Sequence, residues 1–294
     1  MGRRVVISAL VAVILLSISC GDGEMGSPIP PAAITGDNSG GAIAFYQTWR
    51  MSDAGSHVEF YAQKISPEGD FLWGERGILI ASGNATFYRA CDLYAISDGS
   101  GGAFVMWREP LPEPPYHSQP YVAKIDSEGN VEWQRDIPGV DQAIPDGSGG
   151  VIIAYSASVL KVDAEGNLPW GEDGVSLDLG LSDIASDSLG GVIVVSYGVG
   201  NISAQRVDSG GNILWQTGGV EVCGIRGGEA RLIGDGSGRA IIAYVYTLPW
   251  GDGKSGYCDS DIYAQRIDAV GNILWGPDGV PVCVEPLYQY NPEI

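Results

Sequence analysis

Residues 235–246 read DGSGRAIIAYVY, and residues 261–283, after a loop, read DIYAQRIDAVGNILWGPDGVPVC. The two segments form one copy of a unit that occurs five times in the chain. Its acidic turn recurs at Asp37, Asp98, Asp146 and Asp187, and its tryptophan recurs at Trp73, Trp133, Trp170 and Trp215. A repeat of about 40 to 60 residues built from short strands is typical of a β-propeller or a related β array.

Each unit predicts four short strands. An apolar segment such as 93–96 leads into an Asp-Gly turn, and a stronger apolar run such as 103–107 follows. Asp-Gly between two such runs predicts a two-residue hairpin turn, because glycine accepts the positive φ that this turn needs. The third strand ends in a turn with Asp or Ser first and Gly fourth, as in type I turns, and the tryptophan strand follows. We therefore expect an all-β chain, a β-propeller of about five four-stranded antiparallel blades.

The N-terminal residues predict export. Residues 1–19 have the parts of a secretory signal, with basic Arg3 and Arg4, an apolar run over 5–16 and small residues before a cleavage point. This run is too short to span a membrane well. Residues 20–30 are rich in Gly and Pro and predict a flexible tether. Residues 31–294 are then expected to form one repeat domain.

The ending Leu16-Ser17-Ile18-Ser19-Cys20 resembles the lipobox of bacterial lipoproteins. The resemblance implies that Cys20 carries a thioether-linked diacylglycerol and becomes the mature N-terminus. It also implies that the exported protein is held at a membrane of the cell envelope by this lipid. The sequence departs from the family at Ser17, where leucine is preferred. An ordinary secretory signal with a nearby cysteine is the alternative.

Two resemblances concern the repeat itself. YAQRID at 263–268 with GNILW at 271–275 is similar to the tryptophan-docking repeat of quinoprotein-type propellers, in which Asp, a turn Gly and a Trp have the same order. GGAIAFY at 40–46, GGAFVMW at 101–107 and YAQRID also resemble repeats of uncharacterised bacterial envelope proteins. These resemblances imply an architecture and no established activity, because propellers carry unrelated functions. Residues 290–294 have the pattern of one more first strand, which either closes the ring on the first blade or belongs to a longer propeller.

The candidate binding edge is the one that carries the connections between second and third strands. Long loops are expected there at 48–58, 108–119 and 247–261, and variable loops on a rigid scaffold usually carry binding. Aromatic and arginine side chains at this edge suit stacking on sugars or a hot spot of a protein interface. The candidates are Trp49, Arg50, Trp107, Arg108 and Trp250. For strand-end aromatics such as Trp107, the alternative is that they fill the space between blades.

Each third strand also carries one cation near the edge that holds the hairpin aspartate. These are Lys64, Lys124, Lys161, Arg206 and Arg266. We expect each to pair with the aspartate of its own unit within about 4 Å. The aspartates favour turn formation over calcium binding, because calcium needs six or more oxygens and no second acidic residue accompanies each turn.

The sequence assigns no catalytic residue, metal site or cofactor. The two histidines, His57 and His117, have neither ligand spacing nor a nucleophile arrangement around them. The glycines lie in hairpins and not in a phosphate-binding loop. Paired carboxylates that cleave polysaccharide remain open, because their separation is set by the fold. The net charge of −20 repels nucleic acid phosphates, so no nucleic acid partner is expected.

Four cysteines besides Cys20 can oxidise in an exported protein: Cys91, Cys223, Cys258 and Cys283. A disulfide between Cys258 and Cys283 is one candidate, and four free buried thiols are the alternative. Taken together, the sequence favours an envelope-anchored lipoprotein whose propeller binds or scaffolds protein or glycan. A propeller enzyme that acts on polysaccharide, as a glycoside hydrolase or lyase, is the alternative.

Overall fold

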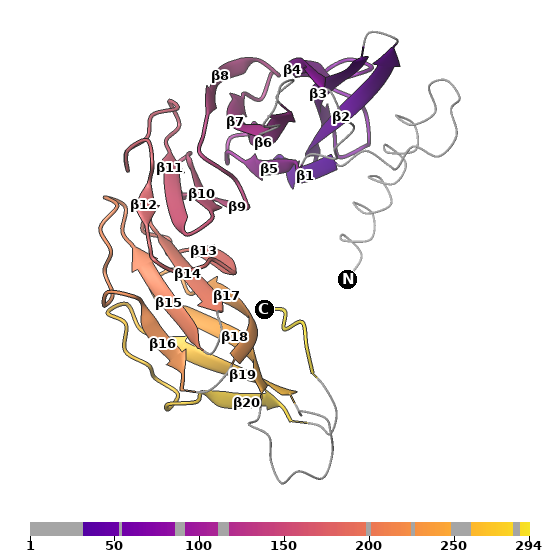
Figure 1. Ribbon diagram of the computed structural model, residues 1–294. Coiled ribbons are helices and arrows are strands. Elements are labelled where there is room, and N and C mark those ends of the chain that lie inside the picture. The colour runs from indigo at the N-terminus through magenta and orange to yellow at the C-terminus, as the bar shows by residue number, and fades with distance from the viewer. Residues whose placement is uncertain are drawn as a thin grey trace. The chain divides into compact units, whose positions relative to one another are not determined.

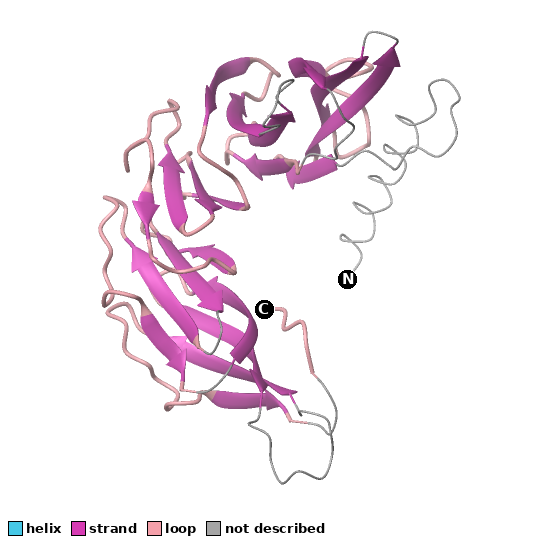
Figure 2. Ribbon diagram, viewed as in Figure 1, coloured by secondary structure: helices cyan, strands magenta, loops and turns pink. Residues whose placement is uncertain are grey.

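The computed structural model describes residues 32–52, 55–85, 92–110, 118–197, 201–224, 227–247, 260–284 and 289–294. All regular structure in these residues is β-strand, arranged in five antiparallel sheets of four strands each (Figures 1 and 2). The predicted fold class, all-β with about five four-stranded propeller blades, is thereby confirmed. Within the same residues, no helix is long and apolar enough to cross a membrane.

The chain divides into two compact units after Gln134, near the end of the last strand of the second sheet. The first unit contains two sheets, each with its strands in chain order: β1 Ala32–Gly36, β2 Ala42–Ser52, β3 Gly55–Ile65 and β4 Ile78–Ala85, then β5 Tyr94–Ser97, β6 Ala103–Pro110, β7 Ser118–Ile125 and β8 Val131–Asp136. The second unit contains three: β9 Gln142–Pro145, β10 Val151–Tyr155, β11 Ser158–Val162 and β12 Val175–Ser176, then β13 Asp183–Ser186, β14 Val192–Tyr197, β15 Ile202–Val207 and β16 Val220–Cys223, then β17 Gly227–Gly234, β18 Ala240–Thr247, β19 Ser260–Ile267 and β20 Val280–Cys283. This order places the first and third turns of every sheet at one edge, as expected.

The hairpin between the first and second strands is longer than the predicted two-residue turn. In the first sheet the amide of Asp37 donates to the Gly41 carbonyl at 3.2 Å. The Asp37 Oδ1 atom accepts from the amides of Ser39 at 2.9 Å and Gly41 at 2.8 Å. Equivalent aspartates organise the same five-residue loop in the other four sheets. The two-residue prediction was wrong because the aspartate side chain, and not the Gly after it, closes the loop.

The turn between third and fourth strands matches its prediction. The Gly129 amide donates to the Asp126 carbonyl at 3.2 Å, and Gly129 has a φ of 92°. The tryptophan of the preceding sheet packs directly on this glycine, since a Cβ built at Gly129 would lie 3.0 Å from the Trp73 ring. Trp170 packs on Gly211 and Trp215 packs on Gly271 in the same manner. Only glycine therefore fits the fourth position of these turns.

The cation of the third strand ties its own sheet to the next one. Arg206 donates to Asp187 in its own sheet at 2.9 Å and to the Ala269 carbonyl of the fifth sheet at 3.1 Å. Lys161 pairs with Asp146 at 3.1 Å and donates to the Gly190 carbonyl of the fourth sheet at 2.7 Å. The third confirmed pair joins Arg266 and Asp235 at 3.7 Å.

The two lysines of the first unit use other partners. Lys124 pairs at 2.8 Å with Glu132 of the adjacent strand β8, so its predicted pairing with Asp98 was wrong. Lys64 donates to the carbonyls of Gly101 at 2.8 Å and Ser127 at 3.3 Å, both in the second sheet. Burial raises the pKa of Asp37, but the hydrogen bonds from Ser39 and Gly41 and the charge of Lys64 together hold that pKa below its ordinary value.

A buried glutamine in the third strand positions the tryptophan of the fourth. The Gln205 Oε1 atom accepts from the Trp215 amide at 3.0 Å, and its Nε2 atom donates to the Gln216 carbonyl at 2.9 Å. Gln63 and Gln265 make the same pair of contacts in the first and fifth sheets. These amides satisfy backbone groups that the irregular fourth strand leaves unpaired.

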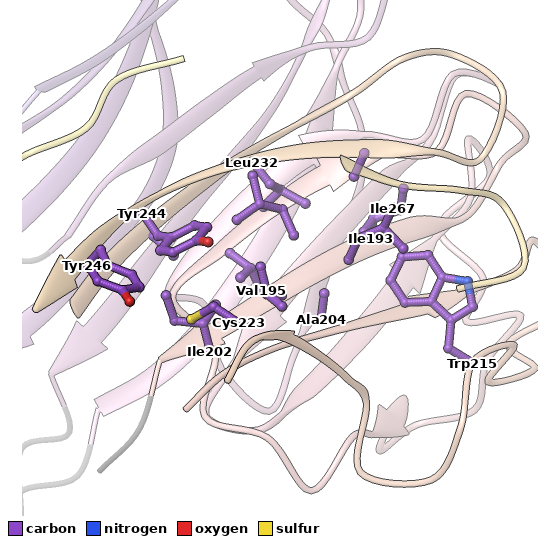
Figure 3. Packing of buried hydrophobic residues seen from close by; sticks show 14 residues of the cluster. Ile193, Val195, Ile202, Ala204, Trp215, Cys223, Leu232, Tyr244, Tyr246 and Ile267 are labelled. Atoms are coloured by element: carbon purple, nitrogen blue, oxygen red, sulfur yellow. The ribbon is translucent and has the colours of Figure 1, made fainter. Parts of the chain in front are cut away.

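Apolar side chains fill the space between neighbouring sheets. Between the fourth and fifth sheets, Ile193, Val195 and Trp215 pack with Leu232 and Tyr244 in one buried cluster (Figure 3). Ile152, Val159 and Trp170 pack in the same way with Ile184 and Val194 between the third and fourth sheets. The described C-terminal residues lie on the fifth sheet, where the Gln289 amide donates to the Ser260 carbonyl at 2.9 Å.

Candidate functional site

The edge that was predicted to vary does vary in the structure. Strands β2 and β3 remain paired as far as Ser52 and Gly55, whereas β10 and β11 are joined by two residues after Tyr155. Trp49 and Arg50 therefore lie within strand β2, and Arg108 lies within β6, and not in the loops that were expected. The hairpin pairing extends farther than the apolar pattern, because polar residues near the tip also pair through their backbones.

Three of these hairpins carry stacked aromatic pairs across the strands. Tyr46 faces Tyr61 with ring centroids 5.7 Å apart, and Trp107 faces Tyr121 at 5.6 Å. In the fifth sheet Tyr263 stacks on Tyr246 at 4.5 Å. Cross-strand aromatic pairs stabilise a hairpin and keep its outer end in register.

Three equivalent tyrosines of the second strands are bonded to their own sheets. Tyr155 donates to the Asp173 carbonyl and Tyr244 donates to the Asp278 carbonyl, each at 2.6 Å. Tyr46 donates in the same way to the Arg76 carbonyl. Burial raises the pKa of Tyr46 to about 12, with a further contribution from Tyr61, and burial raises the pKa of Tyr244 still further. These hydroxyls are neutral structural donors at ordinary pH.

The raised pKa values of Tyr46 and Tyr244 predict that the folded state loses stability at high pH. Above about pH 10 an unfolded tyrosine releases its proton, while Tyr46 keeps it until about pH 12, so the folded state loses stability across that window. Urea unfolding midpoints measured from about pH 9 to about pH 11.5 should therefore fall, and Tyr46→Phe should fall less steeply than the parent. Tyr290→Phe, at an exposed tyrosine, is the matched control. Identical slopes for the parent and Tyr46→Phe would contradict the assignment.

Five residues in the hairpins of the first two sheets belong to one buried cluster or lie next to its members, and we call this group the first-unit aromatic site. Its members are Gln47, Trp49, Trp107, Glu109 and Tyr121. Trp49 and Tyr121 both pack on the buried cluster that contains Trp107. The Trp107 indole donates to the Glu109 carboxylate at 3.2 Å. The site thus combines three aromatic rings with a carboxylate.

Gln47 is the unusual member of this site. It lies between Phe45 and Trp49 on one face of β2 and opposite Phe60 on β3, and Phe60 in turn lies 5.7 Å from Trp107. The side chain is fully buried, and no hydrogen-bond partner for its amide nitrogen or oxygen exists within the described part of the chain. An unpaired buried amide costs about 1–3 kcal/mol of folding free energy. Sequence reasoning missed Gln47, because a glutamine near a strand end gives no signal of burial.

The candidate residues from the sequence are placed as follows. Trp107 is fully buried, which favours its alternative role as a filler between blades, whereas Trp49 and Arg108 are half-buried. The Arg50 side chain, Trp250, Cys20 and Cys258 lie outside the described residues. The half-buried Cys283 thiol at the end of β20 is free, so the structure does not contain the predicted Cys258–Cys283 disulfide.

No group of three His, Cys, Asp or Glu side chains gathers as metal ligands in the described ranges. The first-unit aromatic site contains three aromatic rings, one amide and one carboxylate. Aromatic rings can stack on a ligand, and an amide and a carboxylate can form hydrogen bonds with it.

Neither a protein-family model nor a curated protein matches this chain. Among solved structures, an acylaminoacyl peptidase in complex with Z-Gly-Gly-Phe-chloromethyl ketone aligns with 86% of this chain at 10% identity and a TM-score of 0.40. This chain spans 46% of that peptidase chain. A subtype N11 neuraminidase-like protein of A/flat-faced bat/Peru aligns with 82% of this chain and 88% of its own, at 8% identity and a TM-score of 0.35. The similarities are low in both sequence and coordinates, so nothing about activity passes from these proteins to this chain.

Proposed function

We propose that this protein is an exported, lipid-anchored envelope protein whose propeller blades form a binding module. The observation that carries the proposal is the contrast between the two edges of the sheets. One edge repeats the same aspartate-led loop five times, while the other edge carries hairpins of different length, in which aromatic pairs lie between the paired strands. A rigid scaffold with one variable, aromatic edge is the common arrangement of a binding protein.

The proposed anchor is the lipid on Cys20. A leader that ends in Ser19-Cys20 supports it, and several acyl chains on one residue hold a protein stably at a membrane. The acidic composition supports a partner that is a protein or a glycan and argues against nucleic acid. Localisation at the cell envelope follows from the anchor.

Replacing Cys20 with serine is expected to remove the protein from the membrane fraction. Serine has no thiol for the thioether bond, so the mature chain would carry no lipid. Intact and peptide mass spectrometry of the parent should show an acylated N-terminal Cys20, and fractionation should place Cys20→Ser in the soluble fraction. Cys283→Ser is the matched control and should stay in the membrane fraction. An unmodified parent chain, cut elsewhere and soluble, would overturn the anchor.

An assay for reaction products distinguishes the enzyme alternative from the binding function. A glycoside hydrolase would release reducing ends from polysaccharide, and a lyase would release unsaturated sugars. Retention of an intact glycan or protein without such products is the result that the binding module predicts.

A further inference from the structure

We propose that the first-unit aromatic site binds one unit of a neutral saccharide, with the Gln47 amide as its buried hydrogen-bonding group. This inference rests on the proposed binding function and adds the place and the ligand class. The amide of Gln47 is fully buried, and within the described residues neither of its polar atoms is paired. Sites that keep a locally unfavourable group are the ones where function is expected.

The chemistry around the amide matches a sugar. A ring hydroxyl both donates and accepts a hydrogen bond, and an amide offers both a donor and an acceptor. The Glu109 carboxylate, which already accepts from Trp107 at 3.2 Å, has further lone pairs for a second hydroxyl. The apolar face of a sugar ring stacks on aromatic side chains, and Trp49 and Tyr121 lie on the same cluster.

Charge selects among sugars. The chain carries 36 acidic against 16 basic residues, and the site itself adds Glu109. Anionic sugars are repelled by such a surface, so the saccharide is neutral.

Because the Gln47 amide is fully buried, a ligand can reach it only after side-chain movement. Trp49 lies two residues nearer the hairpin tip on the same face of β2, and it is half-buried. A change of the Trp49 rotamer would expose the amide and place the indole beside the sugar. Rotamer changes of this size are common on binding. Binding is therefore expected to change the tryptophan fluorescence.

The test titrates the full chain, solubilised from membranes, with neutral hexasaccharides built from glucose, N-acetylglucosamine, galactose or mannose. At least one of the four is expected to bind, seen by calorimetry and by a change in tryptophan fluorescence. Gln47→Leu should weaken that binding at least tenfold, because it removes both hydrogen bonds and keeps the volume. The same variant should unfold at a temperature no lower than the parent, because an unpaired amide has been replaced by an apolar group.

Glu59→Gln is the matched control, because Glu59 lies on the opposite face of the same hairpin and should leave binding unchanged. Equal binding by the parent and a folded Gln47→Leu would overturn the site. No binding to any of the four sugars would overturn the ligand class. If the parent chain then still captures an envelope protein under crosslinking, the binding module stands without the saccharide; if it captures nothing, both proposals fail.

Discussion

Replacing Asp187 with alanine is expected to lower the free energy of unfolding by about 3–5 kcal/mol. The Asp187 side chain is fully buried and the Arg206 side chain is 8% exposed, so the substitution leaves an uncompensated buried guanidinium. It also removes the acceptor for the amides of Leu189 and Gly191, which bond to Asp187 at 2.8 Å each. Urea unfolding followed by tryptophan fluorescence measures the loss.

The fifth sheet provides the matched control for this prediction. Asp235 and Arg266 hold the same positions, but their side chains are 26% and 36% exposed and lie 3.7 Å apart. Water can solvate either charge there, so Asp235→Ala should cost about 1 kcal/mol or less through the pair. Asp187→Asn keeps a carbonyl oxygen for the two backbone amides but removes the charge that pairs with Arg206. Its loss of unfolding free energy therefore measures the ion pair apart from the hairpin contacts. Equal losses for Asp187→Ala and Asp235→Ala would show that burial of the pair does not matter.

Trp215→Ala is expected to cost about 3–5 kcal/mol, the range for truncating a buried tryptophan. The indole is 5% exposed, packs on Gly271 of the next sheet and donates to the Ala269 carbonyl at 3.3 Å. Alanine would leave a cavity between the fourth and fifth sheets and would remove one of the two donors to the Ala269 carbonyl, the other being Arg206. The measurement is again the urea midpoint, with the slope checked for a change in the surface exposed on unfolding.

Two further variants test the cause of that loss. Trp275→Ala removes the equivalent side chain of the fifth sheet, which is only half-buried, and should cost clearly less. Gly271→Ala should destabilise through the opposite side of the same contact, because a Cβ there would lie 3.0 Å from the Trp215 ring and the residue has a φ of 93°. A Gly271→Ala variant as stable as the parent would mean that the tryptophan does not depend on this close approach.

The sheets were predictable because their signals are local. An aspartate turn between two apolar runs specifies a hairpin wherever it stands, and the repeat supplied five copies of that signal. The exact hairpin length was not predictable, since it depends on the aspartate side chain reaching amides two and four residues ahead. Local composition could not distinguish that loop from a two-residue turn.

The partners of charged and polar groups were less predictable. Arg206 pairs with the expected aspartate, Asp187, but Lys124 pairs with Glu132 on the neighbouring strand. Nothing in the repeat sequence distinguishes the two cations. In the sequence, Gln205 stands out only because a glutamine recurs in the third strands, as in YAQRI. This recurrence gives no reason to expect that the side chain is buried. Its contacts follow from the path of the fourth strand, which is a tertiary property. Gln47 is similar, because its burial depends on Phe60 and on the second sheet.

The contacts between sheets also define what a duplication must copy. Arg206 stands in the third strand of one sheet, and its acceptor at Ala269 stands after the third strand of the next. Trp215 of the fourth sheet and Gly271 of the fifth sheet likewise meet across the boundary between these two sheets. A gene segment that encodes a single sheet therefore contains no complete interface, whereas a segment that encodes two neighbouring sheets contains a whole one. Recombination between such genes is expected to preserve folding when its crossover points keep that longer segment intact, and fragments designed for expression should follow the same boundaries.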